Sequence, residues 1–155
     1  MKGAFRPISE QQEEVMPKAQ LVHVFNMSAS DLWALIGDFG DTGRWSGRPA
    51  DACIQEGKGI GALRTLTLED GRQIVDRLEA QGECFYSYSI VRSPLPVSAY
   101  KATMAVSPID ASSSRLTWSG EFEPIGMNDS DAIRFWENIY RMGIGLMEKT
   151  IARRL

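Results

Sequence analysis

Six strand-length segments, separated only by short turns, fill most of the sequence between residues 51 and 124. They cover residues 51–57, 61–69, 72–80, 84–92, 98–106 and 114–124. Neighbouring strands joined by a few residues run antiparallel, because a parallel pair needs a crossover of a dozen or more residues. Asp70-Gly71 is the strongest hairpin signal among the turns. The pattern therefore predicts an antiparallel sheet.

Two further kinds of segment frame these strands. Residues 18–27 alternate as a strand, and residues 28–45 suit short helices interrupted by glycines. Residues 128–155 predict a long helix, capped by Asn128, Asp129 or Ser130, with an apolar side and a basic end. The fold class predicted is α+β: a curved seven-stranded antiparallel sheet around a long C-terminal helix, with two short helices between strands one and two. One helix does not fill the concave face of such a sheet, so bulky side chains or a cavity must occupy the rest.

Composition limits the classes of protein to consider. The 155 residues are 43% hydrophobic and 24% charged, as in an ordinary globular protein. We expect one domain over residues 17–155, preceded by a flexible arm over residues 1–16. A net charge of -3 without a basic cluster argues against nucleic acid, and the chain has no apolar run long enough for a membrane span. With no apolar signal region at its start, the chain is predicted to be cytoplasmic, as a monomer or homodimer.

The chain is poor in metal ligands. His23 is its single histidine, and Cys53 and Cys84 lie in strand-like segments typical of reduced, buried thiols. We therefore expect no metal and no cofactor, and interpret His23 as an interior or edge residue with a satisfied side chain.

Alternation places two opposite charges on the apolar faces of neighbouring strands. Arg64 shares a face with Leu66, and Asp76 lies between Ile74 and Leu78 on the next strand. A two-residue Asp-Gly loop would set Arg64 opposite Arg77, whereas a three-residue or bulged loop would set it opposite Asp76. The pair is either a self-satisfied buried ion pair or a polar anchor on the floor of a ligand pocket.

The same alternation predicts which other residues face inward. Large residues are interleaved with small ones, which suggests unfilled volume near Ala62, Ala102 and Gly120. The predicted inner positions are Ile60, Ala62, Leu66, Leu68, Tyr86, Tyr88, Ile90, Tyr100, Ala102, Met104, Val106, Leu116, Trp118, Gly120 and Phe122.

Pro94-Leu95-Pro96 stands between two predicted strands. Proline donates no hydrogen bond to a sheet, so the segment is a stiff loop. It is either an apolar turn packed on the helix or a lid at the open end of the cavity, facing residues 69–72.

Three short motifs carry a resemblance to a known family. They are G-x-x-R at 61–64, D-R-L at 76–78 and PLPVSAY at 94–100. From about Lys18 to its end, the chain resembles the polyketide cyclase/dehydrase branch of the START-related, helix-grip superfamily. The resemblance implies a sheet that grips the C-terminal helix around an apolar cavity. Members bind lipids, sterols, hormones or polyketides, and some catalyse cyclisation or dehydration. The plant abscisic acid receptors look like more distant relatives, but their gate and latch sequences do not occur here.

These observations favour a protein that binds a hydrophobic small molecule. The alternative is a cyclase or dehydratase in the same cavity, with Asp76 as acid or base and Tyr100 or Arg64 stabilising an enolate. A third possibility, a protein-partner module, would expose an apolar patch near residues 94–97. The candidate catalytic residues are Asp76 and Tyr100. The predicted ligand-binding residues are Arg64, Leu66, Asp76, Tyr88, Leu95, Tyr100, Ala102, Met104, Trp118, Phe135 and Ile139.

Overall fold

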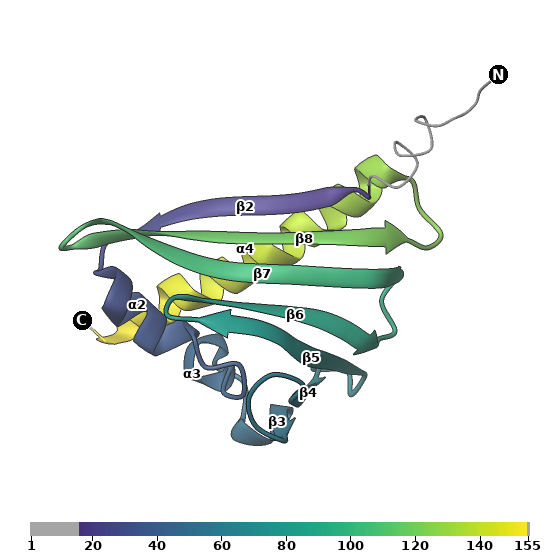
Figure 1. Cartoon of the computed structure of the whole chain (residues 1–155), viewed down its shortest axis with the longest axis horizontal. Helices are drawn as coiled ribbons and strands as arrows, with labels where there is room; N and C mark the ends of the chain where they lie inside the picture. Colours follow the sequence, from purple (N-terminus) through teal and green to yellow (C-terminus); the bar gives the residue numbers. More distant parts are fainter. Residues whose placement is uncertain (1–15, 155) are drawn as a thin grey trace.

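The computed structural model, which describes residues 16–154, contains one seven-stranded antiparallel sheet (Figure 1). Its strand order is β2-β8-β7-β6-β5-β4-β3, so every neighbour beyond the β2–β8 pair is joined by a hairpin. The strands are β2 (Lys18–Phe25), β3 (Cys53–Glu56), β4 (Leu63–Thr67), β5 (Gln73–Gly82), β6 (Phe85–Arg92), β7 (Val97–Asp110) and β8 (Ser113–Pro124).

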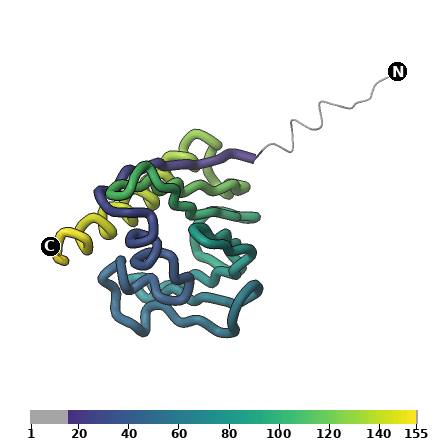
Figure 2. The backbone as a smooth tube through the Cα atoms, turned by 60° about the vertical axis from the view of Figure 1, so that its left-hand side comes forward, coloured from purple at the N-terminus to yellow at the C-terminus, as the bar shows by residue number. Residues whose placement is uncertain are grey.

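The helices lie together on one face of the curved sheet (Figure 2). They are α2 (Ala29–Ile36), α3 (Gly43–Ser46) and the long α4 (Asp129–Arg154), with a short 3-10 turn, η1 (Ala50–Ala52), before β3. The predicted α+β helix-grip architecture is confirmed, including the two short helices between the first two strands. The turn η1 was not predicted.

Local sequence explains where the helices begin. The Ser28 hydroxyl accepts a hydrogen bond from the Asp31 amide at the start of α2. The Asn128 side chain accepts one from the Asp131 amide at the start of α4. Each cap satisfies an amide that has no partner within its own helix.

The hairpin between β4 and β5 decides the register of the two buried charges. Leu68 and Arg72 close the loop through a 2.8 Å backbone hydrogen bond, which leaves three residues at its tip. Gly71 has a φ of 89°, a conformation that favours glycine. Arg64 consequently lies opposite Asp76, so the second of the two predicted registers is correct.

One predicted inner position is wrong. Ile60 is 59% exposed, because it lies in a turn and β4 begins only at Leu63. Gly57, Gly59 and Gly61 all have positive φ and turn the chain there, which ends the alternation on which the prediction rested.

A bulge in β7 sets the direction of Tyr100. The register with β8 shifts between Ser98 and Lys101, and Ala99 adopts a φ of 51°. Val97 and Tyr100 are therefore both buried although three positions separate them. The extra residue turns the Tyr100 side chain to the concave face.

Several smaller expectations have mixed outcomes. His23 on the edge strand β2 is half-buried and lies 2.7 Å from Glu148 of α4, which confirms a satisfied edge histidine. Both cysteines are free: Cys53 is buried, whereas Cys84 is half-buried in the β5–β6 turn rather than in a strand. Of the predicted arm over residues 1–16, residues 1–15 lie outside the described part of the chain. In residues 16–154, no helix has the length and apolar character needed to cross a membrane.

Candidate ligand-binding cavity

A cavity of about 610 Å³ lies between α4 and the concave face of the sheet. Its walls are mostly aromatic and aliphatic, and its floor carries the buried Arg64 and Asp76 side chains. Trp45 of α3 and the edge of α4 that carries Ile139 and Met142 complete the walls.

The structure brings ten of the eleven predicted ligand-binding residues to this cavity. The ten are Arg64, Leu66, Asp76, Tyr88, Leu95, Tyr100, Met104, Trp118, Phe135 and Ile139. Ala102 is buried but does not line the cavity. It pairs with Tyr88 and Gly120 on the neighbouring strands, and its methyl group is too short to reach past the larger side chains around it. Contact of the ten with a ligand stays a prediction.

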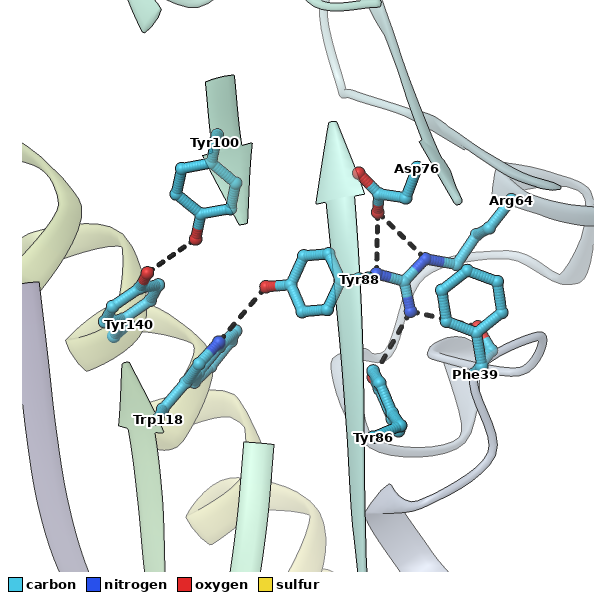
Figure 3. A network of polar contacts seen from close by, with 8 residues as sticks. All are labelled: Phe39, Arg64, Asp76, Tyr86, Tyr88, Tyr100, Trp118 and Tyr140. Atoms are coloured by element: carbon cyan, nitrogen blue, oxygen red, sulfur yellow. Dashed lines mark hydrogen bonds and ion pairs between the residues drawn. The ribbon is translucent and has the colours of Figure 1, made fainter. Parts of the chain in front are cut away.

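Arg64 and Asp76 form an ion pair on the cavity floor (Figure 3). The Arg64 Nη2 and Nε atoms donate to Asp76 Oδ2 over 2.6 and 3.0 Å. Arg64 Nη1 donates to the Phe39 carbonyl at 3.0 Å and to the Tyr86 hydroxyl at 3.2 Å. The guanidinium carbon also lies 4.2 Å from the centre of the Phe39 ring and 5.0 Å from that of Tyr88. Burial raises the pKa of the Asp76 carboxyl, and the Arg64 charge opposes that shift in part.

A second polar cluster lies beside the first (Figure 3). The hydroxyls of Tyr100 and Tyr140 are 2.5 Å apart, and Trp118 Nε1 donates to the Tyr88 hydroxyl at 3.1 Å. Burial raises the pKa of Tyr88, Tyr100 and Tyr140. At neutral pH these phenols are therefore neutral: Tyr100 and Tyr140 bond to each other, and Tyr88 accepts from Trp118.

Asp76 and Trp45, which both line the cavity, each hold a buried polar atom with almost no accessible surface. Within residues 16–154, neither Asp76 Oδ1 nor Trp45 Nε1 has a hydrogen-bond partner. Asp76 is 2% and Trp45 7% exposed. A buried polar atom without a partner is rare, because it loses its hydration and gains nothing in return.

Exposed side chains mark the mouth of the cavity, which we define as Glu69 and Arg72 of the β4–β5 loop together with Met142 and Leu146 of α4. Leu95 also lines the cavity, so the Pro94-Leu95-Pro96 loop lies at the cavity, as predicted. A role as a lid stays a prediction. The patch expected of a partner module does not form there, because Leu95 packs partly into the core.

The family follows from a comparison of the whole described chain. Residues 16–152 match the model of the family described as polyketide cyclase / dehydrase and lipid transport. The chain belongs to this family. The resemblance drawn from three short motifs is thus confirmed over nearly the full length.

Solved structures support the fold of this family member. Protein XoxI from Bacillus cereus superposes with a TM-score of 0.76 at 29% identity, over 86% of this chain and 94% of that one. A START superfamily protein from Mycobacterium smegmatis gives a TM-score of 0.70 at 9% identity, over 90% and 99%. The di-domain ARO/CYC protein BexL, from the BE-7585A biosynthetic pathway, gives a TM-score of 0.70 at 14% identity. That match covers 88% of this chain and 47% of the BexL chain. No curated protein is significantly similar to this chain.

Sequence patterns missed several cavity residues of this family domain. Trp45 follows a run of glycines whose path was not predictable, and Tyr140, Met142, Gly143 and Leu146 required knowledge of which edge of α4 faces the hollow. The signal that was present is the spacing of Phe135, Ile139, Met142 and Leu146 along one side of the helix.

The prediction of unfilled volume near Ala62, Ala102 and Gly120 is wrong. A Cβ atom added at Gly120 would lie 2.3 Å from the Tyr140 hydroxyl and 3.2 Å from Tyr100. The space above Gly120 is therefore filled by the tyrosine pair. Neither Ala62, Ala102 nor Gly120 lines the cavity, which lies instead where α4 no longer packs on the sheet.

Proposed function

We propose that this protein binds a hydrophobic small molecule in the cavity between the sheet and α4. The observation that carries the proposal is a hollow of about 610 Å³ with mostly apolar walls in the middle of the domain. Ligand pockets typically have volumes of about 300–1,000 Å³ and apolar walls with a few polar groups. The family, whose description includes lipid transport, supports the same conclusion.

The mouth supports passage of an apolar ligand. Met142 is 69% and Leu146 38% exposed, although both line the cavity. Apolar side chains at an entrance lose their contact with water when an apolar molecule covers them, and this burial favours binding by about 25 cal/mol per Å².

A probe that fluoresces in apolar surroundings tests the proposal. N-phenyl-1-naphthylamine should bind with a stoichiometry near one, and a hydrophobic competitor should displace it. Leu66→Trp should abolish this binding, because the indole would occupy the cavity that Leu66 lines. Ile54→Trp is the matched control, since Ile54 is 48% exposed on β3 and does not line the cavity. Equal binding by both variants would refute the site.

A second candidate function is a cyclase or dehydratase with Asp76 as the acid or base. Two observations favour it: Asp76 Oδ1 has no partner within residues 16–154, and the pKa of Asp76 is raised, as suits proton transfer. It ranks second because Arg64, Tyr100 and Tyr140 already bond to other protein groups.

A short poly-β-ketone separates the two candidates. Heptane-2,4,6-trione cyclises to 5-methylresorcinol with loss of one water molecule, which chromatography detects. An enzyme should accelerate this reaction, and Asp76→Asn should remove the acceleration while leaving the binding of N-phenyl-1-naphthylamine in place. A rate equal to that in buffer would argue against this activity.

A further inference from the structure

The buried ion pair borders the cavity but is almost inaccessible from it. The side chains of Arg64 and Asp76 are only 4% and 2% exposed. The rings of Phe39 and Tyr88 lie 4.2 and 5.0 Å from the Arg64 guanidinium carbon and cover it (Figure 3). Arg64 keeps one N–H donor beyond its four hydrogen bonds, but a side chain buried this deeply does not offer that donor to a ligand. The pair therefore links β4, β5 and the segment after α2, and does not anchor a polar group of the ligand.

The tyrosine hydroxyls beside the pair are closed off in the same way. Tyr86 and Tyr100 are 2% exposed, Tyr88 is 7% exposed, and Tyr140 is fully buried. Each of their hydroxyls has a hydrogen-bond partner within the protein. Among the described residues, the deep end of the cavity thus presents almost no accessible charge or hydroxyl to a ligand.

The cavity residues that keep accessible surface inside the hollow are mainly aliphatic. They come from the strands β4 to β6 with their loops on one side and from α4 on the other. Among them are Leu66, Ile74, Ile90, Leu95, Ile139 and Met142, all half-buried or exposed. Such a wall favours burial of methylene groups and makes burial of a hydroxyl or a charge costly.

Most of the accessible polar side chains of the cavity gather at one part of its mouth, which we call the polar rim: Ser46, Arg48, Thr67, Glu69 and Arg72. Arg48 donates to the Thr67 carbonyl at 2.9 Å and lies 4.0 Å from Glu69. Within the described part of the chain, each of the two arginines makes one side-chain hydrogen bond. Both therefore keep N–H donors for oxygen atoms of a ligand.

The volume of the cavity limits the ligand to one chain. A methylene group occupies about as much space as a water molecule, ~30 Å³, so a hollow of about 610 Å³ holds at most about 20 carbon atoms. A lipid with two long acyl chains exceeds this limit.

We propose that the cavity binds a single-chain amphiphile with its tail inside: the aliphatic chain fills the hollow between α4 and β4 to β6, and the polar head group stays at the polar rim in contact with water. This inference rests on the proposed binding function and specifies the ligand class and its orientation. A bulky head group is then tolerated, whereas a polar group at the far end of the chain is not.

Three probes with the same ten-carbon chain test the orientation by displacement of N-phenyl-1-naphthylamine, below their critical micelle concentrations. Decan-1-ol and decyl β-D-glucoside differ only in the head group and should bind with similar affinities. Decane-1,10-diol should bind roughly tenfold or more weakly than decan-1-ol, because its second hydroxyl would be buried without a partner. A diol that binds as tightly as the alcohol, or a glucoside that does not bind, would overturn the inference.

Chain length provides a second test with one constant head group. From hexyl to octyl to decyl glucoside, affinity should rise roughly fourfold for each added methylene, since each is buried in the hollow. Equal affinities along this series would contradict a tail that lies inside.

A charge placed at the mouth tests where the head group lies. Met142 is 69% exposed and lines the cavity. At pH 7.5, Met142→Lys should raise the affinity for decanoate relative to decan-1-ol severalfold, and Met142→Glu should lower it, because the carboxylate lies near this position. Ile54→Lys, on the exposed side of β3 and away from the cavity, is the matched control and should leave the ratio unchanged. The same ratio in both Met142 variants would place the head group away from the mouth and refute the orientation.

These experiments distinguish the two levels of the proposal. If neither N-phenyl-1-naphthylamine nor decan-1-ol binds, the proposed binding function itself fails. If both bind, but the diol equals the alcohol or the glucoside is excluded, the binding function stands and only the tail-inside orientation is refuted. The comparison of the three ten-carbon probes needs no variant, so it remains decisive even if a substitution disturbs the fold.

Discussion

The two halves of the concave face differ in what covers them. In the filled half, β2 and β8 carry the main contacts of α4 with the sheet, and Leu116 and Phe122 of β8 are fully buried. In the hollow half, formed by β4, β5 and β6, the inward side chains Leu66 and Ile74 are only half-buried and line the cavity. The 26-residue helix α4 thus packs against one half of the concave face and leaves the other half uncovered. Stability and ligand binding should therefore depend on different halves.

The largest effect is expected at the boundary between the halves, where Tyr88, Tyr100 and Tyr140 are buried. Their pKa values are raised by burial, so the folded protein keeps these phenols protonated above pH 10 while the unfolded chain ionises them. The unfolded state then binds fewer protons, and the free energy of unfolding falls as pH rises, by about 1.4 kcal/mol per pH unit for each tyrosine. Absorbance at 295 nm should rise together with loss of near-ultraviolet circular dichroism. Tyrosinate forming in a still-folded protein would show that these side chains are accessible.

A pair of identical truncations compares the halves directly. Leu116→Ala should lower the free energy of unfolding by about 2–5 kcal/mol, because it opens a cavity in the filled half. Leu66→Ala should lower it by about 1 kcal/mol or less, because Leu66 already borders empty space, but should weaken binding of N-phenyl-1-naphthylamine. Urea denaturation of both variants measures the difference. Equal costs would mean that the hollow half is packed as tightly as the filled half.

Two glycines of α4 sharpen the comparison. A Cβ atom at Gly143 would lie 2.8 Å from the Trp118 ring, so Gly143→Ala should destabilise the protein by about 1–3 kcal/mol despite its better helix propensity. At Gly145 the added atom would meet nothing within 4 Å, and Gly145→Ala should stabilise by about 1 kcal/mol. Thermal unfolding should therefore shift in opposite directions. A shift of the unfolding temperature in the same direction for both variants would contradict the close approach of the Trp118 ring to Gly143.

The smallest effect is expected at the bulge of β7. Ala99 has a φ of 51°, where glycine is favoured, and it is exposed. Ala99→Gly should stabilise the protein by up to about 1 kcal/mol, since relief of the backbone strain exceeds the entropy that glycine loses on folding. A clear loss of stability in chemical denaturation would contradict this account of the bulge.

The sequence predicted most of the fold because its signals are local. Alternation with a period of two placed Tyr86, Tyr88 and Met104 on the inner face without any knowledge of the tertiary structure. The partner of Arg64 could not be fixed in this way, because it depends on whether the β4–β5 loop has two residues or three at its tip. The conformation of Gly71 decided it.

The cavity wall was less predictable because it depends on distant packing. Trp45 reaches the cavity from α3, whose position depends on the loops around it and not on any periodic pattern. Ala102 has the predicted orientation, but it lies among longer side chains and does not line the cavity. Alternation predicts the face on which a side chain lies, but not whether the side chain extends to the cavity.

A crystal structure of the protein with N-phenyl-1-naphthylamine tests the central claim most directly. We predict that the probe lies between α4 and the strands of the hollow half, in contact with Trp45, Leu66 and Ile139. Side chains that close this space, with the probe absent or bound on the outer surface, would contradict the account.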